Sequence, residues 1–114
     1  MIFRYTILYV DDVPATLDFY ERAFGLKRGF LHESGDYGEM ATGETKLAFS
    51  STTLMRQLGK DPAKPAPKAP VFELAFEADD VPAALALASP RHNAPPLNAT
   101  APNAAASVGE AKPV

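Results

Sequence analysis

Two glutamates on expected strands are the residues whose type and position could do chemistry. Glu39 lies on the same strand face as Tyr37 and Ala41, and Glu73 lies in a later strand. A pair of carboxylates can transfer protons or attract a cation when the fold brings them together. The plainer interpretation also stays open, that both are solvated carboxylates of an acidic protein whose net charge is −3.

Other catalytic groups have little support. The only histidines are His32, on an expected strand, and His92, near the end of the chain. Their separation argues against a Ser-His-Asp triad or a histidine metal site. There is no cysteine, which excludes a disulfide framework, a thiolate metal site and a cysteine nucleophile. The glycine-containing stretch 35–38 lacks the lysine and the following helix of a phosphate-binding loop.

Length and composition indicate one soluble domain. The chain has 114 residues, of which 46% are hydrophobic and 22% charged. It has no long basic run, so nucleic acid is not an expected partner. No apolar run approaches the ~18 residues of a membrane span, and the first residues do not resemble a signal peptide. A cytoplasmic location without membrane contact is therefore expected.

The pentapeptide DDVPA occurs twice, at 11–15 and at 79–83, and it indicates a repeated strand-to-helix junction. Residues 3–10 alternate like a strand, with Phe3, Tyr5, Ile7 and Tyr9 on one face. An aspartate of the pentapeptide can cap the next helix, and Pro14 suits its first turn. The apolar stripe of that helix is Val13, Leu17, Tyr20 and Phe24, and Gly25 is placed to end it.

The rest of the chain predicts one complete βαβββ module and the start of a second. Strands are expected at 26–33, 37–42 and 45–51, followed by a helical turn at 53–59. The segment 60–70, KDPAKPAPKAP, is expected to be an extended, solvated connector. A strand at 71–78 and a helix at 83–88 begin the second module. The predicted divisions are 1–59, 60–70, 71–88 and a tail at 89–114.

The tail departs from this pattern. Residues 89–114 hold five prolines, seven alanines and no aromatic residue, and no strand is expected there. A complete second module would need three more strands. Three explanations stay open: a truncated or altered chain, a sequence that differs from the true one, or ordering by a partner.

The stretch YTILYVDDVPATLDFYERAFGL resembles the opening of the vicinal oxygen chelate superfamily, which includes glyoxalase I, bleomycin-resistance proteins and extradiol dioxygenases. The resemblance extends over roughly residues 3–88. It implies an α+β fold in which βαβββ modules with curved, mixed or antiparallel sheets pair around a cleft. It does not fix the activity, because the family spans lyases, dioxygenases, epimerases and drug-binding proteins.

In metal-dependent members of this family, the ligands lie on the first and last strands of each module. These positions fall on Tyr5, Ala48 and Glu73 in this sequence. Only Glu73 is a good divalent-metal ligand, and a catalytic ion normally has about three protein ligands. No metal or cofactor is therefore expected. Glu73 is then either a polar group that contacts a ligand or a carboxylate at the rim of the cleft.

The resemblance implies a metal-free protein that binds a small organic ligand, similar to bleomycin-resistance proteins. The residues expected to line the cleft are Phe3, Tyr5, Ile7, Tyr9, Glu39, Ala48, Ser50 and Glu73. The aromatic stripe could equally be core covered by a partner sheet, and a homodimer is expected because a half-built second module leaves this face uncovered. The alternatives are a metal-dependent glyoxalase- or dioxygenase-type enzyme whose site is completed across the dimer, and a fold without current chemistry.

Overall fold

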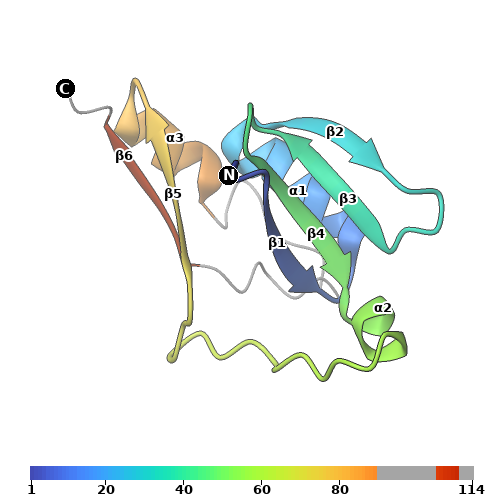
Figure 1. Cartoon of the computed structure of the whole chain (residues 1–114). Helices are drawn as coiled ribbons and strands as arrows, with labels where there is room; N and C mark the ends of the chain where they lie inside the picture. Colours follow the sequence, from blue (N-terminus) through green and yellow to red (C-terminus); the bar gives the residue numbers. More distant parts are fainter. Residues whose placement is uncertain (90–104, 111–114) are drawn as a thin grey trace.

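The computed structural model describes residues 1–89 and a strand at 105–110, and it begins with the predicted βαβββ order (Figure 1). The elements are β1 (Tyr5–Val10), α1 (Val13–Phe24), β2 (Lys27–Leu31), β3 (Tyr37–Ala41) and β4 (Lys46–Ser51). The strands form one sheet in the order β1-β4-β3-β2. β1 is parallel to β4, and the other pairs are antiparallel. The α+β class and the curved, mixed sheet are therefore confirmed.

The first pentapeptide forms the predicted junction between β1 and α1. Asp12 is the N-cap, and its Oδ1 accepts a hydrogen bond from the Ala15 amide at 3.0 Å. This bond satisfies one of the amides that an α-helix leaves without a partner in its first turn. Gly25 ends the helix with a φ of 66°, a left-handed conformation that glycine adopts at little cost. Local sequence therefore sets both ends of α1.

One face of the sheet packs against α1 and forms the core. The cluster of buried residues consists of Val10, Val13, Leu17, Tyr20, Met40, Leu47 and Phe49. Gly38 in β3 allows the helix to approach closely, because a Cβ at this position would lie 2.7 Å from Leu17 Cδ1. Phe76, from the second βα unit that begins with β5 (Glu73–Ala78), stacks on Phe24 with a centroid distance of 4.8 Å. Both units therefore share apolar contacts with α1.

The second unit begins as predicted, with β5 (Glu73–Ala78) and α3 (Val81–Ala88). Asp80 caps α3 as Asp12 caps α1, accepting from the Ala83 amide at 3.0 Å. The repeated pentapeptide is thus a repeated junction.

The prediction of an irregular tail is wrong for residues 105–110. They form β6 (Ala105–Glu110), which is parallel to β5 (Figure 1). The prolines that argued against a strand, at 90, 95, 96 and 102, all lie outside this segment, so none removes a donor from it. The parallel pair β5–β6 has the same arrangement as β1–β4. The rest of the tail lies outside the described residues.

Several element ends differ from the predictions by one or two residues. The helical turn after β4 is α2 (Thr52–Gln57), which starts one residue earlier than expected and is capped by Ser51. β1 starts at Tyr5, so Phe3 precedes the strand and is 68% exposed. Within the described residues, no helix combines the length and apolar character needed to cross a bilayer.

Candidate functional site

Most of the predicted cleft residues lie on the face of the four-stranded sheet that points away from α1, called the open face below. The cross-strand register aligns Ile7, Ala48, Glu39 and Phe30 in one row across all four strands. The neighbouring row consists of Tyr9, Ser50 and Tyr37. The open face therefore combines aromatic side chains with one central carboxylate.

A bulge in β2 directs the side chains of Arg28 and Phe30 to opposite faces of the sheet, although residues two apart in a regular strand share a face. The register shifts between Arg28 and Phe30, so Gly29 is the extra residue. The Arg28 guanidinium binds two carboxylates of α1, those of Asp18 and, at 2.9 Å, Glu21. Phe30 pairs with β3 on the open face and is half exposed. The bulge thus attaches β2 to the helix and adds an aromatic ring to the open face.

Glu39 is the best-connected polar group of the open face. Its Oε2 accepts a hydrogen bond from the Tyr37 hydroxyl at 2.8 Å, and its Oε1 lies 3.6 Å from Lys46 Nζ. The Glu39 side chain is only 14% exposed. Burial raises the pKa of the Tyr37 phenol well above its ordinary value, and the Glu39 carboxylate raises it further. At neutral pH, Tyr37 is therefore a stable donor to Glu39.

The other predicted site residues differ in accessibility. Tyr5, Ile7 and Tyr9 are 44%, 46% and 37% exposed, so their side chains can meet a ligand or a partner. Ala48 and Ser50 are buried beneath their neighbours and form the floor of the open face.

Glu73 lies apart from Glu39, because it belongs to β5 in the other sheet. Glu73 is exposed, whereas Glu39 already has two partners on its own sheet. No hydrogen bond or ion pair between the two glutamates occurs in the described part of the chain. The structure therefore does not make them an acid–base pair within one chain.

Tyr5, Ala48 and Glu73, the positions at which the resemblance places metal ligands, do not offer a set of donors that fits a divalent ion. Ala48 has no donor atom and is 0% exposed, and Tyr5 would offer only a phenol oxygen. Among the described residues, no group of three or more His, Cys, Asp or Glu side chains is placed to hold a metal. A catalytic divalent ion normally needs about three protein ligands. Glu73 is the one suitable donor in this set.

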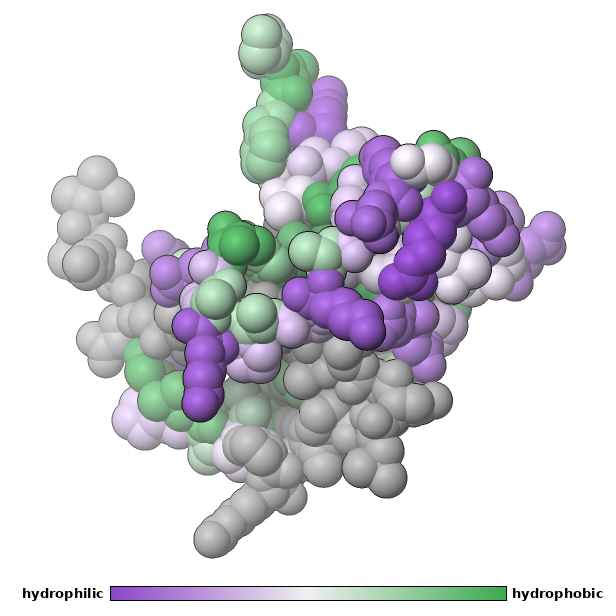
Figure 2. Space-filling view, turned by 90° about the horizontal axis from the view of Figure 1, so that it is seen from below, coloured by the Kyte–Doolittle hydropathy of each residue, from purple (hydrophilic) through white to green (hydrophobic). Residues whose placement is uncertain are grey.

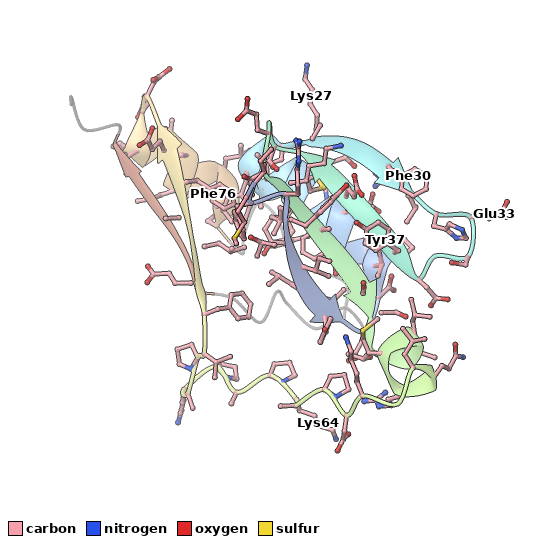
Figure 3. All side chains as sticks on the ribbon, viewed as in Figure 1. Lys27, Phe30, Glu33, Tyr37, Lys64 and Phe76 are labelled. Atoms are coloured by element: carbon pink, nitrogen blue, oxygen red, sulfur yellow. The ribbon has the colours of Figure 1, made fainter. Side chains whose placement is uncertain are left out.

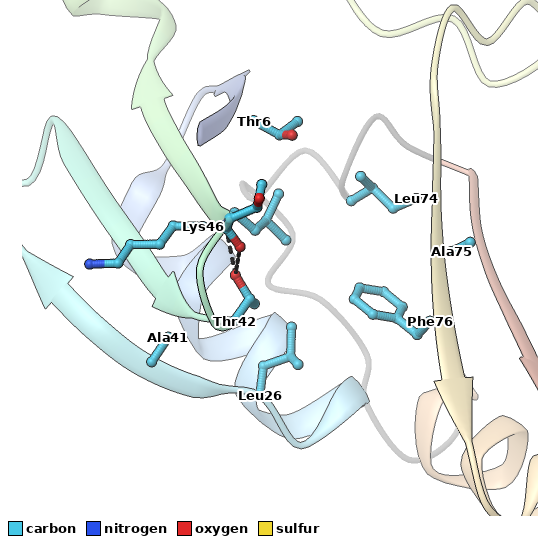
Figure 4. Close-up of a pocket in the computed structure, with 10 residues that line it drawn as sticks. Thr6, Leu26, Ala41, Thr42, Lys46, Leu74, Ala75 and Phe76 are labelled. Carbon is cyan, nitrogen blue, oxygen red and sulfur yellow. Dashed lines mark hydrogen bonds between the residues drawn. The ribbon is translucent and has the colours of Figure 1, made fainter. Parts of the chain in front are cut away.

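A cavity of about 480 Å³ separates the two sheets near the β3–β4 hairpin (Figure 4). Leu74, Ala75 and Phe76 of β5 line one side, and Phe76 projects between β5 and the four-stranded unit (Figure 3). The opposite wall includes Leu26 and Thr42. The Thr42 hydroxyl donates to the Thr45 carbonyl and accepts from the Leu47 amide, so it is already engaged.

A second cavity of about 420 Å³ lies between β1 and the connector. Its β1 wall consists of Ile7, Leu8 and Tyr9, and the connector contributes mainly proline and alanine. Lys60 Nζ donates to the Tyr9 hydroxyl at 3.2 Å and lies 5.5 Å from the centre of the Tyr9 ring. This cavity, called the edge groove below, brings together two residues predicted for the cleft, Ile7 and Tyr9.

Sequence reasoning missed three contributors to these sites. The connector was expected only as a solvated linker, yet it forms a wall of the edge groove. Lys46 was not considered, although its position next to Glu39 follows from the register of β3 and β4. Leu74 and Phe76 were the third contributor. They alternate in the sequence with Glu73 and Glu77, and this alternation was the available signal that one side of β5 packs against the core.

Comparison with known proteins identifies one family. The model of the Glyoxalase/Bleomycin resistance protein/Dioxygenase superfamily matches residues 2–98. No curated protein sequence gives a match.

Solved structures show the same fold. A protein of unknown function from Agrobacterium tumefaciens is 27% identical, with a TM-score of 0.59 over 79% of this chain and 68% of that chain. A glyoxalase/bleomycin resistance protein/dioxygenase family enzyme from Burkholderia phytofirmans is 19% identical, with a TM-score of 0.55 over 74% and 68%. A lactoylglutathione lyase from A. tumefaciens is 24% identical, with a TM-score of 0.51 over 73% and 64%. The matched region is thus about two thirds of each relative's length.

Proposed function

Because the chain belongs to the glyoxalase/bleomycin resistance protein/dioxygenase superfamily, we propose that it binds a small organic molecule without a metal ion. One observation supports this proposal: of Tyr5, Ala48 and Glu73, the positions at which the resemblance places the family's metal ligands, Ala48 is buried and has no donor atom. A family enzyme that polarises substrate oxygens through a metal needs a nearly complete ligand set. Binding requires only a complementary surface.

The open face supports a ligand with a flat apolar part and a polar group. Tyr5, Tyr9 and Phe30 are partly exposed and offer ring faces, on which aromatic groups stack favourably. Glu39 and Lys46 supply charges of both signs next to these rings. Since Glu39 already accepts from Tyr37 and faces Lys46, its charge is partly compensated, and the ligand need not be strongly cationic.

A homodimer is part of the proposal. The partly exposed residues Tyr5, Ile7, Tyr9 and Phe30 form an apolar area that a single chain leaves uncovered in its described part. Exposed apolar areas of this kind commonly mark interaction surfaces. A second copy facing this area would turn the open face into a cleft. A cytoplasmic location and a role in resistance to a toxic organic compound belong to the same proposal.

Thermal shift tests the binding proposal. Purified protein would be heated with a panel of aromatic compounds that carry amine, carboxylate or hydroxyl groups, and hits would be titrated by calorimetry. The proposal predicts at least one ligand whose affinity falls about tenfold or more in Tyr5→Ala. The matched control is Phe3→Ala, because Phe3 is exposed but precedes the sheet. Binding that is unchanged in Tyr5→Ala would exclude the open face as the site.

The competing function, a metal-dependent glyoxalase- or dioxygenase-type enzyme, is tested by activity assays. Hemithioacetals and catechols would be offered as substrates in the presence of Zn²⁺, Ni²⁺, Mn²⁺ or Fe²⁺. Turnover that depends on added metal and is lost in Glu73→Gln would favour an enzyme whose ligand set is completed across a dimer. Turnover by protein that has been depleted of metal with a chelator would contradict both functions.

A further inference from the structure

The open face carries a third row of residues, next to the row that contains Glu39. Tyr5 of β1 lies opposite Lys46 of β4, and Lys27 of β2 lies opposite Ala41 of β3. Lys46 and Ala41 are each two residues along their strands from the Glu39–Ala48 pair, so both point to the open face. This row, called the lysine row below, therefore crosses all four strands in the order Tyr5, Lys46, Ala41 and Lys27.

The start of β2 places Lys27 on the open face. Its neighbour Arg28 is held on the opposite face by the two carboxylates of α1. Successive side chains of a strand alternate between faces, so Lys27 points the other way. Lys27 is exposed, forms no ion pair among the described residues, and projects outward from β2 (Figure 3). Its ammonium is thus available to a ligand.

Lys46 is only partly neutralised by Glu39. Their charged atoms are 3.6 Å apart, which is longer than a hydrogen bond, and the Lys46 side chain is 44% exposed. Lys46 also extends away from the cavity between the two sheets (Figure 4). An ammonium group has three donors, so Lys46 can bind a second anion while it still faces Glu39.

The charges that a ligand can reach on the open face are positive. The four strands place three charged side chains there, namely Lys27, Lys46 and Glu39. Two lysines and one glutamate leave one net positive charge. The Glu39 carboxylate is the least exposed of the three groups, and it already accepts a hydrogen bond from Tyr37. A ligand therefore meets two accessible ammonium groups and one shielded carboxylate.

The margins of the open face do not reverse this charge. Near α2, the Lys60 ammonium lies over the Tyr9 ring, and the end of the molecule seen from below carries hydrophilic side chains close to hydrophobic ones (Figure 2). The acids of the two hairpin turns lie beyond the strand ends, and none of them forms an ion pair with a lysine in the described part of the chain; they are Glu33, Asp36 and Glu44.

The lysine row has space for a flat ligand with an acidic group. Ala41 is exposed and presents only a methyl group between the two lysines. Lys27 and Lys46 are two strands apart, about 10 Å, so their long side chains can converge on one carboxylate. On the other side of Lys46, the Tyr5 side chain is 44% exposed and offers a ring face.

We propose that the open face selects an organic anion, a flat aromatic molecule with one carboxylate, whose ring lies on Tyr5 and whose carboxylate binds Lys46 and Lys27. Charge-assisted hydrogen bonds of this kind are among the stronger polar contacts. One net positive charge matches a monoanion, whereas Glu39 would repel the second charge of a dianion. This inference rests on the proposed small-molecule function and names the ligand class of that same site.

Three matched probes test the charge preference. 2-Naphthoate, 2-naphthamide and 2-naphthamidine share one ring system and are negative, neutral and positive. The chain has no tryptophan, so naphthalene fluorescence can be followed in titrations without an indole signal. Naphthoate is expected to bind about tenfold or more tightly than naphthamide, and naphthamidine most weakly. This preference should shrink as salt is raised, because salt screens exposed charges. The same trio built on benzene and on biphenyl, followed by ligand-detected NMR, covers smaller and larger ligands.

Lys46→Met tests the role of the ammonium, since it removes the charge and keeps a long side chain. It is expected to weaken naphthoate binding about tenfold and to change naphthamide binding less than about threefold. Lys27→Met should act in the same direction, and it gives the same test if Lys46→Met does not fold. The matched control is Lys68→Met, the same change at an exposed lysine of the connector, which should leave the preference for naphthoate intact.

Two results would overturn the inference and leave the proposed function in place. The first is binding of the amides or amidines as tight as that of the carboxylates, with affinity still lost in Tyr5→Ala. The second is a preference for carboxylates that persists in both Lys46→Met and Lys27→Met, because the anion would then bind elsewhere. Absence of any Tyr5-dependent binding across all probes would contradict the small-molecule function itself, and the inference with it.

Discussion

Tyr20 offers a sharp test of the core, because its buried hydroxyl has no hydrogen-bond partner within the described part of the chain. The residue is 0% exposed, and no hydrogen bond to its hydroxyl is found among the described residues. Its ring packs against Phe49 and Phe24, with centroid distances of 5.1 Å and 5.4 Å. Tyr20→Phe removes the hydroxyl and keeps these ring contacts. We therefore expect this substitution to stabilise the protein.

The magnitude follows from the cost of leaving a polar group unpaired. A buried hydroxyl without a hydrogen bond costs about 1–3 kcal/mol relative to its hydrated state. A small cavity replaces the oxygen, so the gain in unfolding free energy is expected at the lower end, about 1–2 kcal/mol. For a urea m value of about 1.5–2 kcal/mol/M, the midpoint should rise by roughly 0.5–1 M with no change in m.

Tyr37→Phe is the matched control. It also removes a tyrosine hydroxyl, but this hydroxyl donates a hydrogen bond to Glu39. It leaves Glu39 Oε2 without the 2.8 Å hydrogen bond. Hydrogen bonds to charged groups contribute about 1.5–3 kcal/mol, and partial exposure reduces this to about 1–2 kcal/mol here. The two variants should thus shift the urea midpoint in opposite directions. A loss of stability in Tyr20→Phe would refute the reasoning, because it would mean that the hydroxyl is hydrogen-bonded.

Three further predictions concern the stability of the folded chain. Burial raises the pKa of both tyrosines above the ordinary value of 10.0, so above about pH 10 the unfolded chain releases protons that the folded chain keeps. Unfolding free energy should therefore fall as pH rises from 10, and less so in the double Tyr→Phe variant, as urea titrations at several pH values would show. Gly38→Ala should cost about 1–3 kcal/mol by forcing a methyl group into Leu17, measured as a lower melting temperature. Asp12→Ala should cost about 1 kcal/mol, whereas Asp80→Ala should cost clearly less because α3 buries no residue; chemical denaturation compares the two.

The parts of the fold that could be predicted are those set by local sequence. The caps of α1 and its apolar stripe depend on residues within one or two turns of each other. The alternation of β1 likewise indicated the exposed face that carries Tyr5, Ile7 and Tyr9. β6 could not be predicted because its residues are small and show no clear alternation, and its pairing with β5 depends on tertiary contacts.

The candidate sites depend on pairings that the sequence does not display. Lys46 meets Glu39 only through the register of two antiparallel strands. The edge groove depends on the path of the connector, whose prolines indicated an extended chain but not its position beside β1. Glu39 and Glu73 could be proposed as a pair from the sequence, but their strands belong to different sheets.

Bound metal per chain is the measurement that tests the central claim most directly. Protein purified without chelator or affinity tag would be incubated in turn with Zn²⁺, Ni²⁺, Mn²⁺ and Fe²⁺, desalted, and analysed by mass spectrometry for metal content. A metal-free binding protein should retain far less than one ion per chain with every metal. About one ion per chain, or one per dimer, that is lost in Glu73→Gln would contradict the claim and would indicate a ligand set completed by a partner.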